Sequence, residues 1–400
     1  MQRWTALILS TVLALMLLTP GPASAQGPIK IGVLQGVTGP FEVYAKQMIT
    51  GFKLGLEYGT GGKNELLGRK VEVLIEDDQL KPDVSKRLIT KLYADDKVDL
   101  VVGTTSSAAA LAILPVAQEF KKLLIVEPAV ADSITGANWN RYIFRTGRNS
   151  GQDAIANALA VAKPGAQIAT IAQDYAFGRD GVAAYKAAVE KAGVKVVHEE
   201  YAPVQATDFT APIQRIIGAL KDKPGDKYVF VIWAGKGGPF PQLVASRLDK
   251  YGITLTGGGN VLDVLKAMKA LGLEGMVGGL YYYYEIPKNP VNDWLVREHQ
   301  KRFGSPPDFF TAGGFAAAMA VVTGVQKAKS TDTEKLVAAM EGMEFETPKG
   351  KMIFRKEDHQ ALQTMYAFKM TAKPDVAWLV PVLTRELSPA ETAPPIQNKR

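Results

Sequence analysis

Residues 98–107 read Val-Asp-Leu-Val-Val-Gly-Thr-Thr-Ser-Ser, and this stretch decides how the rest of the chain is interpreted. Residues 98–102 form a short apolar run that predicts a buried strand, and the alanine-rich segment after it predicts a helix. The turn between them offers hydroxyl groups and free backbone N–H groups at a helix N-terminus, where negative charge is favoured. Thr105, Ser106 and Ser107 are therefore candidates for helix capping or for binding a carboxylate, and the two roles are compatible.

Outward from this stretch, strand patterns and helical patterns alternate along the chain. Strand patterns occupy residues 29–34, 71–75, 98–102, 123–126, 167–172, 194–197 and 228–233. Helical spacing of apolar residues occupies about 44–58, a segment from 83, then 111–121, 183–191, 211–220, 291–303, 316–327 and 333–340. A β-rich part follows at 351–354 and 366–370. Strands separated by helices pack as a parallel sheet that helices cover on both faces, so the sequence predicts an α/β protein.

The length predicts two lobes. A chain of 400 residues is too long for one core, and two lobes of fewer than about 200 residues each are the usual solution. The polar stretch 145–150 joins two runs of the alternation, and we interpret it as a crossing between lobes. The segment 389–400 is rich in proline, alanine and charge, which predicts a loose C-terminal tail.

Residues 1–25 have the features of a cleaved secretory signal peptide. Arg3 provides the positive start, 6–18 is almost continuously apolar, and Ala23-Ser24-Ala25 is a typical cleavage site. The apolar run is shorter than the roughly 20 residues that span a bilayer. We therefore predict cleavage after Ala25 and an exported, periplasmic protein.

Composition excludes several classes of protein. The 47 Lys and Arg residues are scattered among 40 Asp and Glu residues, and the net charge of +7 forms no basic stripe for a nucleic acid. The chain has no cysteine, so disulfides, zinc–thiolate sites and thiol nucleophiles are excluded.

Motifs of catalysis are missing as well. The sequence has no phosphate-binding G-x-x-x-x-G-K-[ST], no G-x-S-x-G nucleophile turn and no H-E-x-x-H. His198, His299 and His359 lie in separate segments, which suits packing or surface roles better than a metal site. Asp77 and Asp78 are adjacent on a strand and point to opposite faces, which suits polar capping of the strand end. We predict no catalytic residue, no metal and no cofactor.

Seven short blocks in order resemble the branched-chain amino acid class of periplasmic substrate-binding proteins of ABC importers. The blocks are Ile29-Lys30-Ile31-Gly32-Val33, Thr38-Gly39-Pro40, Gly68-Arg69-Lys70-Val71-Glu72 followed by Asp77-Asp78, Lys97 to Gly103 with Ser106-Ser107, Phe144-Arg145-Thr146, Asp174-Tyr175-Ala176-Phe177-Gly178-Arg179 and Thr207-Asp208-Phe209-Thr210. The resemblance covers about residues 29–210 directly, and the remainder has a compatible order of helices and strands.

The resemblance implies the type I periplasmic-binding fold, in which three crossing strands join two Rossmann-like lobes with parallel central sheets. It places the crossings near Thr146, Tyr282 and Gln363. Lobe 1 is then 28–146 with 282–362, and lobe 2 is 147–281 with 363–388. The implied activity is the capture of a small solute between the lobes by hinge closure, for delivery to a membrane permease.

The resemblance also implies site residues. The carboxylate-binding loop of the family falls on Thr105, Ser106 and Ser107, and its ring-bearing residue falls on Tyr44. The second hydroxyl clamp falls in Ala129-Val130-Ala131, where the expected hydroxyl near Val130 is missing. Phe177 stands where a tyrosine is common.

The expected partner of an amino-acid ammonium group is missing too. That carboxylate falls near Asn260 or Val261, and neither residue is acidic. A buried ammonium without a counter-charge costs several kcal/mol. The departures lead us to expect an aromatic or other non-amino-acid carboxylate as the ligand.

Aromatic residues are frequent among the candidates for the cleft. The candidates are Tyr44, Tyr175, Phe177, Trp233 and the run Tyr281-Tyr282-Tyr283-Tyr284. If that run is a strand, only alternate rings face one cleft, and Tyr283 is our candidate among them. Arg145, Arg148 or Lys236 are candidates to add positive charge to a carboxylate site.

Three alternatives remain open at this stage. The ligand can be a branched-chain or other amino acid of the same importer class. The protein can be a ligand sensor of the same fold that docks on a membrane receptor. It can also be a secreted α/β enzyme. The main hypothesis is a monomeric solute-binding protein that serves an ABC permease.

Overall fold

The structure is a computed structural model that describes residues 27–235, 237–258 and 261–398. The predicted signal peptide and two predicted site residues, Lys236 and Asn260, lie outside the described residues.

The first sheet has six strands in the order β2-β3-β1-β4-β5-β6. Its strands are β1 (Ile29–Gln35), β2 (Glu65–Leu66), β3 (Arg69–Asp77), β4 (Leu100–Gly103), β5 (Leu123–Val126) and β6 (Ile143–Arg145). All neighbouring strands pair in parallel except β2 and β3, which are antiparallel. The helices of this part are α1 (Glu42–Gly59), α2 (Pro82–Ala94) and α3 (Ser107–Phe120). The predicted strand at 98–102 is β4, whose four residues are all buried. This part confirms the predicted α/β class.

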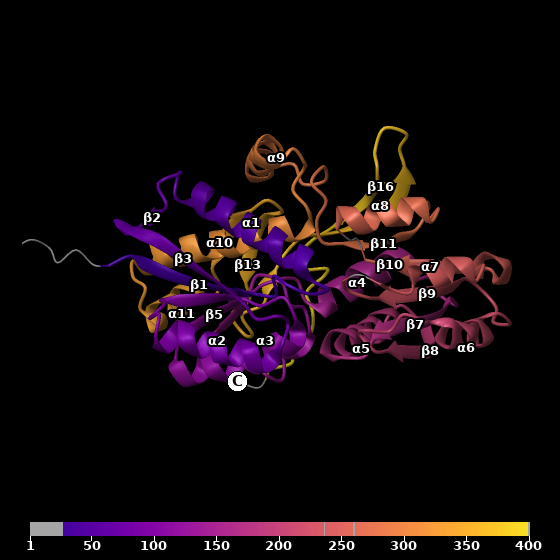
Figure 1. Ribbon diagram of the computed structural model, residues 1–400. Helices are drawn as coiled ribbons and strands as arrows, with labels where there is room; N and C mark the ends of the chain where they lie inside the picture. The colour runs from indigo at the N-terminus through magenta and orange to yellow at the C-terminus, as the bar shows by residue number, and fades with distance from the viewer. Residues whose placement is uncertain (1–26, 236, 259–260, 399–400) are drawn as a thin grey trace, which may run out of the picture.

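The second sheet is parallel throughout, in the order β10-β9-β7-β8. Its strands are β7 (Gln167–Gln173), β8 (Lys195–Ala202), β9 (Lys227–Ile232) and β10 (Ile253–Gly257). The helices of this part are α4 (Ser150–Val161), α5 (Ala176–Glu190), α6 (Thr210–Leu220), α7 (Phe240–Ala245) and α8 (Leu262–Ala270). Figure 1 shows the two sheets with their helices side by side, α1 to α3 on one side and α5 to α8 on the other.

The last third of the chain adds two antiparallel sheets, β11-β15-β16 and β12-β13-β14. The strands are β11 (Val277–Leu280), β12 (Glu344–Thr347), β13 (Gly350–Phe354), β14 (Ala361–Leu362), β15 (Met365–Ala372) and β16 (Leu379–Leu387), and the helices are α9 (Pro290–Phe303), α10 (Phe309–Ala328) and α11 (Thr333–Met340). The sequence did not predict β16 as a strand. Pro381 and a row of exposed residues interrupt its pattern, which an edge strand tolerates because its outer groups need no partner strand.

Three links connect the parts of the chain around the two parallel sheets. Thr146 lies between β6 and α4, Tyr282 between β11 and α9, and Gln363 between β14 and β15. The division into two lobes at these positions remains our proposal.

Helices α1 and α10 pack closely because glycines face the backbone of the partner helix. A Cβ at Gly51 would lie 1.9 Å from the carbonyl oxygen of Thr311, and a Cβ at Gly314 would lie 1.9 Å from that of Met48. Helix α10 is long and apolar enough to cross a membrane by composition, yet 89% of its most apolar window is buried inside the protein. It is therefore a core helix, which packs on α1 beside the first sheet.

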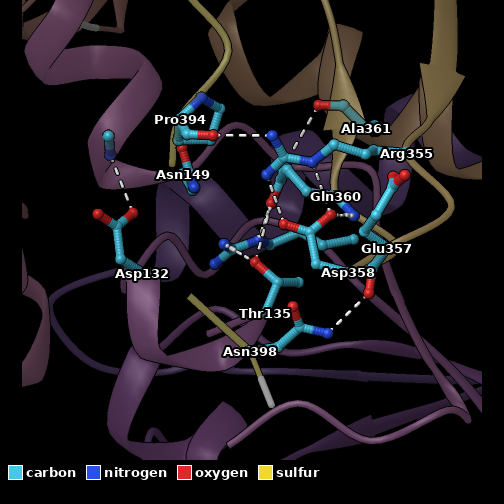
Figure 2. A network of polar contacts seen from close by, with 12 residues as sticks. Asp132, Thr135, Asn149, Arg355, Glu357, Asp358, Gln360, Ala361, Pro394 and Asn398 are labelled. Atoms are coloured by element: carbon cyan, nitrogen blue, oxygen red, sulfur yellow. Dashed lines mark hydrogen bonds and ion pairs between the residues drawn. The ribbon is translucent and has the colours of Figure 1, made fainter. Parts of the chain in front are cut away.

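The described part of the predicted loose tail, residues 389–398, is bonded to the protein, which differs from the expectation. Arg355 Nη1 donates to the carbonyl oxygen of Pro394 over 2.7 Å, and Asn398 Nδ2 donates to the carbonyl oxygen of Glu357 over 2.7 Å (Figure 2). The tail has little apolar periodicity, so its attachment depends on contacts with distant residues that the local pattern does not encode.

A chain that ends at Leu387 is expected to lose roughly 2 kcal/mol of unfolding free energy, since it loses the bond to Arg355 and the fully buried Thr392. Urea denaturation measures the change. A chain that ends at Asn398 is the control and should match the full mature chain. Equal midpoints for the chain ending at Leu387 and the control would show that the tail contributes nothing to stability.

Candidate functional site

Of the four hydroxyl residues in the turn after β4, Thr105 and Ser107 differ in their hydrogen bonds. Thr105 Oγ1 donates to Gln35 Oε1 over 2.7 Å, so its hydrogen is already used. Ser107 Oγ accepts from Ala131 N over 3.2 Å, and its own hydrogen meets no acceptor among the residues that the structure describes. Ser107 is also the first residue of α3, where backbone N–H groups lack partners within the helix.

A cavity of about 70 Å³, here called the inner cavity, lies at this turn. Both sheets contribute to its lining through segments that follow β1, β4, β5, β6, β7 and β9, and the start of α10 adds Phe309 and Phe310. The lining residues are Phe41, Tyr44, Thr105, Ser107, Pro128, Ala129, Val130, Arg148, Tyr175, Phe177, Trp233, Ala234, Phe309 and Phe310. Segments at the carboxyl ends of parallel strands therefore form the cavity, as is usual for ligand sites in α/β folds.

Aromatic rings make up much of the cavity wall. The rings of Tyr44 and Phe310 lie 4.3 Å apart between centroids, and Phe41 stacks on Tyr44 at 5.7 Å. Phe309 and Phe310 begin α10 and meet edge to face at 5.0 Å. These geometries are favourable for aromatic pairs and leave a wall that suits a flat apolar ligand.

Arg148 brings a positive charge to the wall. Its guanidinium carbon lies 4.8 Å from the ring centroid of Phe309 and 5.4 Å from that of Tyr281. Its Nε donates to Asp153 over 3.1 Å, and its side chain is 13% exposed. Within the described part of the chain, Nη1 and Nη2 have no hydrogen-bond acceptor. The fork of this arginine is thus free to bind a carboxylate.

Two buried titratable groups, Glu127 and Lys349, lie near Arg148. Burial raises the pKa of Glu127 to about 7, although the neighbouring Arg148 opposes the shift, and Thr146 Oγ1 donates to this carboxyl over 3.1 Å. Burial lowers the pKa of Lys349 well below its usual range, and its Nζ donates to Gln363 over 2.7 Å. Neither Glu127 nor Lys349 lines the inner cavity, so Arg148 is the charged residue among its described lining residues.

A hydrogen bond joins the two parts of the chain beside the inner cavity. The backbone N–H of Gly235, which follows β9, donates to Tyr44 Oη over 2.8 Å. Tyr44 belongs to α1, and its hydroxyl pKa is raised by burial. The ring of Tyr44 is therefore fixed at the boundary between the two parallel sheets.

The structure brings most of the predicted site residues together and separates a few. Those that line the inner cavity are Tyr44, Thr105, Ser107, Ala129, Val130, Tyr175, Phe177 and Trp233. Ser106 and Ala131 are buried next to the cavity but do not line it. Ser106 precedes α3 as its cap residue, and Ala131 N donates to Ser107.

The strand pattern that the sequence suggests for the tyrosine run is wrong, because β11 ends at Leu280, and the site role of Tyr283 remains a prediction. Tyr283 instead accepts a hydrogen bond from Trp378 Nε1 over 3.1 Å and lines a different hollow. Tyr281 is buried, as are Tyr282 and Tyr283, and it is the member of the run whose ring faces Arg148.

Sequence reasoning missed several lining residues. These are Phe41, Pro128, Ala234, Phe309 and Phe310, and Arg148 was only one of three candidate cations. The other two lie elsewhere or outside the description: Arg145 is fully buried and bonded to Gln360, and Lys236 is not among the described residues. Phe309 and Phe310 lie after all the predicted site residues in the sequence, the nearest of which is Tyr283. No motif marked their position.

Comparisons with known proteins agree with this fold. A family model described as "Periplasmic binding protein" matches residues 28–375. A crystal structure of an ABC-type branched-chain amino acid transporter from Rhodopseudomonas palustris is 63% identical, covers 93% of this chain and 100% of that one, and superposes with a TM-score of 0.84. A solute-binding protein of an ABC transporter from the same species, in complex with 3,4-dihydroxybenzoic acid, is 30% identical, covers 91% and 98%, and has a TM-score of 0.79.

A curated relative from Brucella abortus, named Leu/Ile/Val-binding protein homolog 6, is 29% identical over 91% of this chain and 93% of its own length. The family model alone spans most of the chain, and the structural neighbours share the α/β fold. The chain therefore belongs to the periplasmic binding proteins, the solute-binding components of ABC transporters.

Proposed function

We propose that this protein binds an aromatic monocarboxylate in the inner cavity and delivers it to an ABC permease by closure of its two lobes. The observation that carries the proposal is the charge of the cavity lining. Among the described lining residues, Arg148 is charged and none is acidic. An α-amino acid would bury its ammonium group there without a counter-charge, at a cost of several kcal/mol.

The carboxylate is expected to meet three kinds of donor. Arg148 offers its free fork, Ser107 offers its hydroxyl hydrogen, and the first turn of α3 offers backbone N–H groups. The ring of the ligand then packs among the aromatic side chains that line the same cavity. The bound 3,4-dihydroxybenzoic acid of the 30% identical relative supports this ligand class.

A second candidate ligand is a branched-chain amino acid. It is favoured by the description of the 63% identical relative as a branched-chain amino acid transporter. An acidic residue close to Arg148, Asp153, lines an adjoining cavity of about 90 Å³ and not the inner one. The two cavities share Arg148, Phe177, Trp233 and Phe309. Asp153 already pairs with Arg148, so it is a poor partner for an ammonium group.

Export to the periplasm completes the proposal. We place signal-peptide cleavage after Ala25, so that the mature protein begins at Gln26 and meets its ligand outside the cytoplasmic membrane. The permease of an ABC importer is the expected partner, and a membrane receptor in its place would make the protein a sensor.

A thermal-shift screen of the mature chain tests the ligand class. A ligand at 100 times its dissociation constant stabilises the protein by about 2.7 kcal/mol, which moves the melting temperature visibly. The panel contains benzoate and hydroxybenzoates, aromatic amino acids, and leucine, isoleucine and valine. Shifts with the aromatic acids support the proposal, whereas shifts confined to the amino acids overturn it and leave the transport role in place.

The double change Ser107→Ala with Thr105→Ala is expected to weaken binding of the aromatic carboxylate at least tenfold. The change at Ser107 removes a hydroxyl donor from the cavity wall. The change at Thr105 removes the hydroxyl that donates to Gln35 Oε1 at the end of β1. Ser106→Ala is the matched control, because Ser106 does not line the cavity. Calorimetric titration compares the variants, and unchanged affinity in the double variant would remove this turn from the site.

A further inference from the structure

A second, larger cavity lies beside the inner one. This outer cavity measures about 310 Å³ and is lined by Pro40, Val43, Tyr44, Trp233, Gly235, Gly237, Gly238, Phe240, Pro241, Val261, Asp263, Val264, Ala267, Met268 and Leu271. Tyr44 and Trp233 are the described residues that line both cavities. The outer cavity therefore adjoins the inner one, and these two aromatic rings border both.

The outer cavity is chemically unlike the inner one. Asp263 is its charged residue, and the other described lining residues are apolar, aromatic or glycine. A charged or strongly polar group placed there would lose its water without gaining partners, whereas an apolar group would gain from leaving water. A second carboxylate on the ligand is disfavoured further by the negative charge of Asp263.

One hydrogen-bond donor lies on the shared wall. Trp233 Nε1 is buried and has no acceptor among the residues that the structure describes. It lies close to Gly238 of the outer cavity, 3.3 Å from the position that a Cβ of that glycine would take. A buried donor without a partner is costly, and an acceptor atom of a ligand would satisfy it.

We propose that the outer cavity receives an apolar substituent on the ligand's ring, joined through an acceptor such as an ether oxygen that faces Trp233. The ligand class is then an alkoxy-substituted aromatic monocarboxylate, with its carboxylate at Arg148 and its apolar extension beyond Tyr44. This inference rests on the proposed function and adds to it the part of the ligand that the small inner cavity leaves unplaced.

The test compares benzoate with 4-butoxybenzoate by calorimetric titration of the mature chain. The butoxy compound is expected to bind at least tenfold more tightly. Ala267→Trp places a large side chain in the outer cavity from an exposed position of α8, so the ratio of the two affinities should fall below threefold. Ala270→Trp is the matched control: it is equally exposed on the same helix but does not line the cavity, and the ratio should persist.

Two results would overturn the inference. One is equal affinity of the wild-type protein for the two compounds, and the other is a ratio that Ala267→Trp leaves intact. If benzoate binds and the butoxy group adds nothing, only the outer subsite fails. If neither compound binds while leucine or valine does, the proposed function fails and the subsite fails with it.

Discussion

Replacing Arg148 with methionine is expected to weaken binding of benzoate about 100-fold, a loss of roughly 2.8 kcal/mol. The guanidinium is the charged group of the inner-cavity lining, and its two terminal nitrogens have no acceptor within the described residues. Methionine keeps the length and much of the packing against Phe309 but removes the charge and the donors. Calorimetric titration measures the change.

Two variants separate charge from geometry. Arg148→Lys keeps a positive charge without the planar fork, so an intermediate loss of about tenfold is expected. Arg179→Met removes a cation that is about half exposed and paired with Asp174, and it should leave binding unchanged. Melting temperatures of the unliganded variants show whether each one is folded, because Arg148→Met also leaves Asp153 without its partner. A folded Arg148→Met protein with full affinity would exclude Arg148 from carboxylate binding.

Gly51→Val is expected to destabilise the protein by about 3 kcal/mol or more, at the upper end of the usual cost of overpacking a core. The new Cβ would begin 1.9 Å from the carbonyl oxygen of Thr311, which belongs to the backbone of α10 and cannot rotate away. The two helices would have to separate, and α10 is the buried core helix of this part of the chain. Urea denaturation of the purified variant measures the loss.

Gly218→Val is the matched control for this change. Gly218 lies in α6, where a Cβ would meet nothing within 4 Å. Replacing an exposed helical glycine reduces the backbone entropy that the chain loses on folding. The unfolding free energy should therefore stay the same or rise slightly. If Gly51→Val proved as stable as Gly218→Val, the close packing of α1 on α10 would be wrong.

The position of Arg148 shows where sequence reasoning reached its limit in the site. The sequence marked a polar stretch at 145–150 and offered Arg145 and Arg148 as equal candidates. In the structure Arg145 Nη1 bonds to the carbonyl oxygen of Ala131 and its Nε bonds to Gln360, a residue more than 200 positions away. Those partners occupy one arginine and leave the other for the cavity. Local spacing does not contain that distinction, because it depends on which distant segment arrives beside each side chain.

The tyrosine run at 281–284 shows a similar limit for secondary structure. Four aromatic residues in a row satisfy the pattern of a strand, and the sequence offers nothing against it. The strand nevertheless ends at Leu280, and the side chains of the run enter separate environments: Tyr282 bonds to Asn292 and Tyr283 to Trp378. Propensity describes what an aromatic residue tolerates, and tertiary partners decided what this run became.

The sequence by itself determined the class of the protein and the location of the polar turn before α3. Short apolar strands, helical spacing between them and a polar turn before α3 are local patterns, and local patterns are what a sequence displays directly. Tertiary structure decided the composition of the cavity, which takes residues from Phe41 to Phe310, and the choice of Arg148 as its cation. The physical reason is that secondary structure follows from neighbours in the chain, whereas a cavity is formed by surfaces that meet only after the sheets have packed.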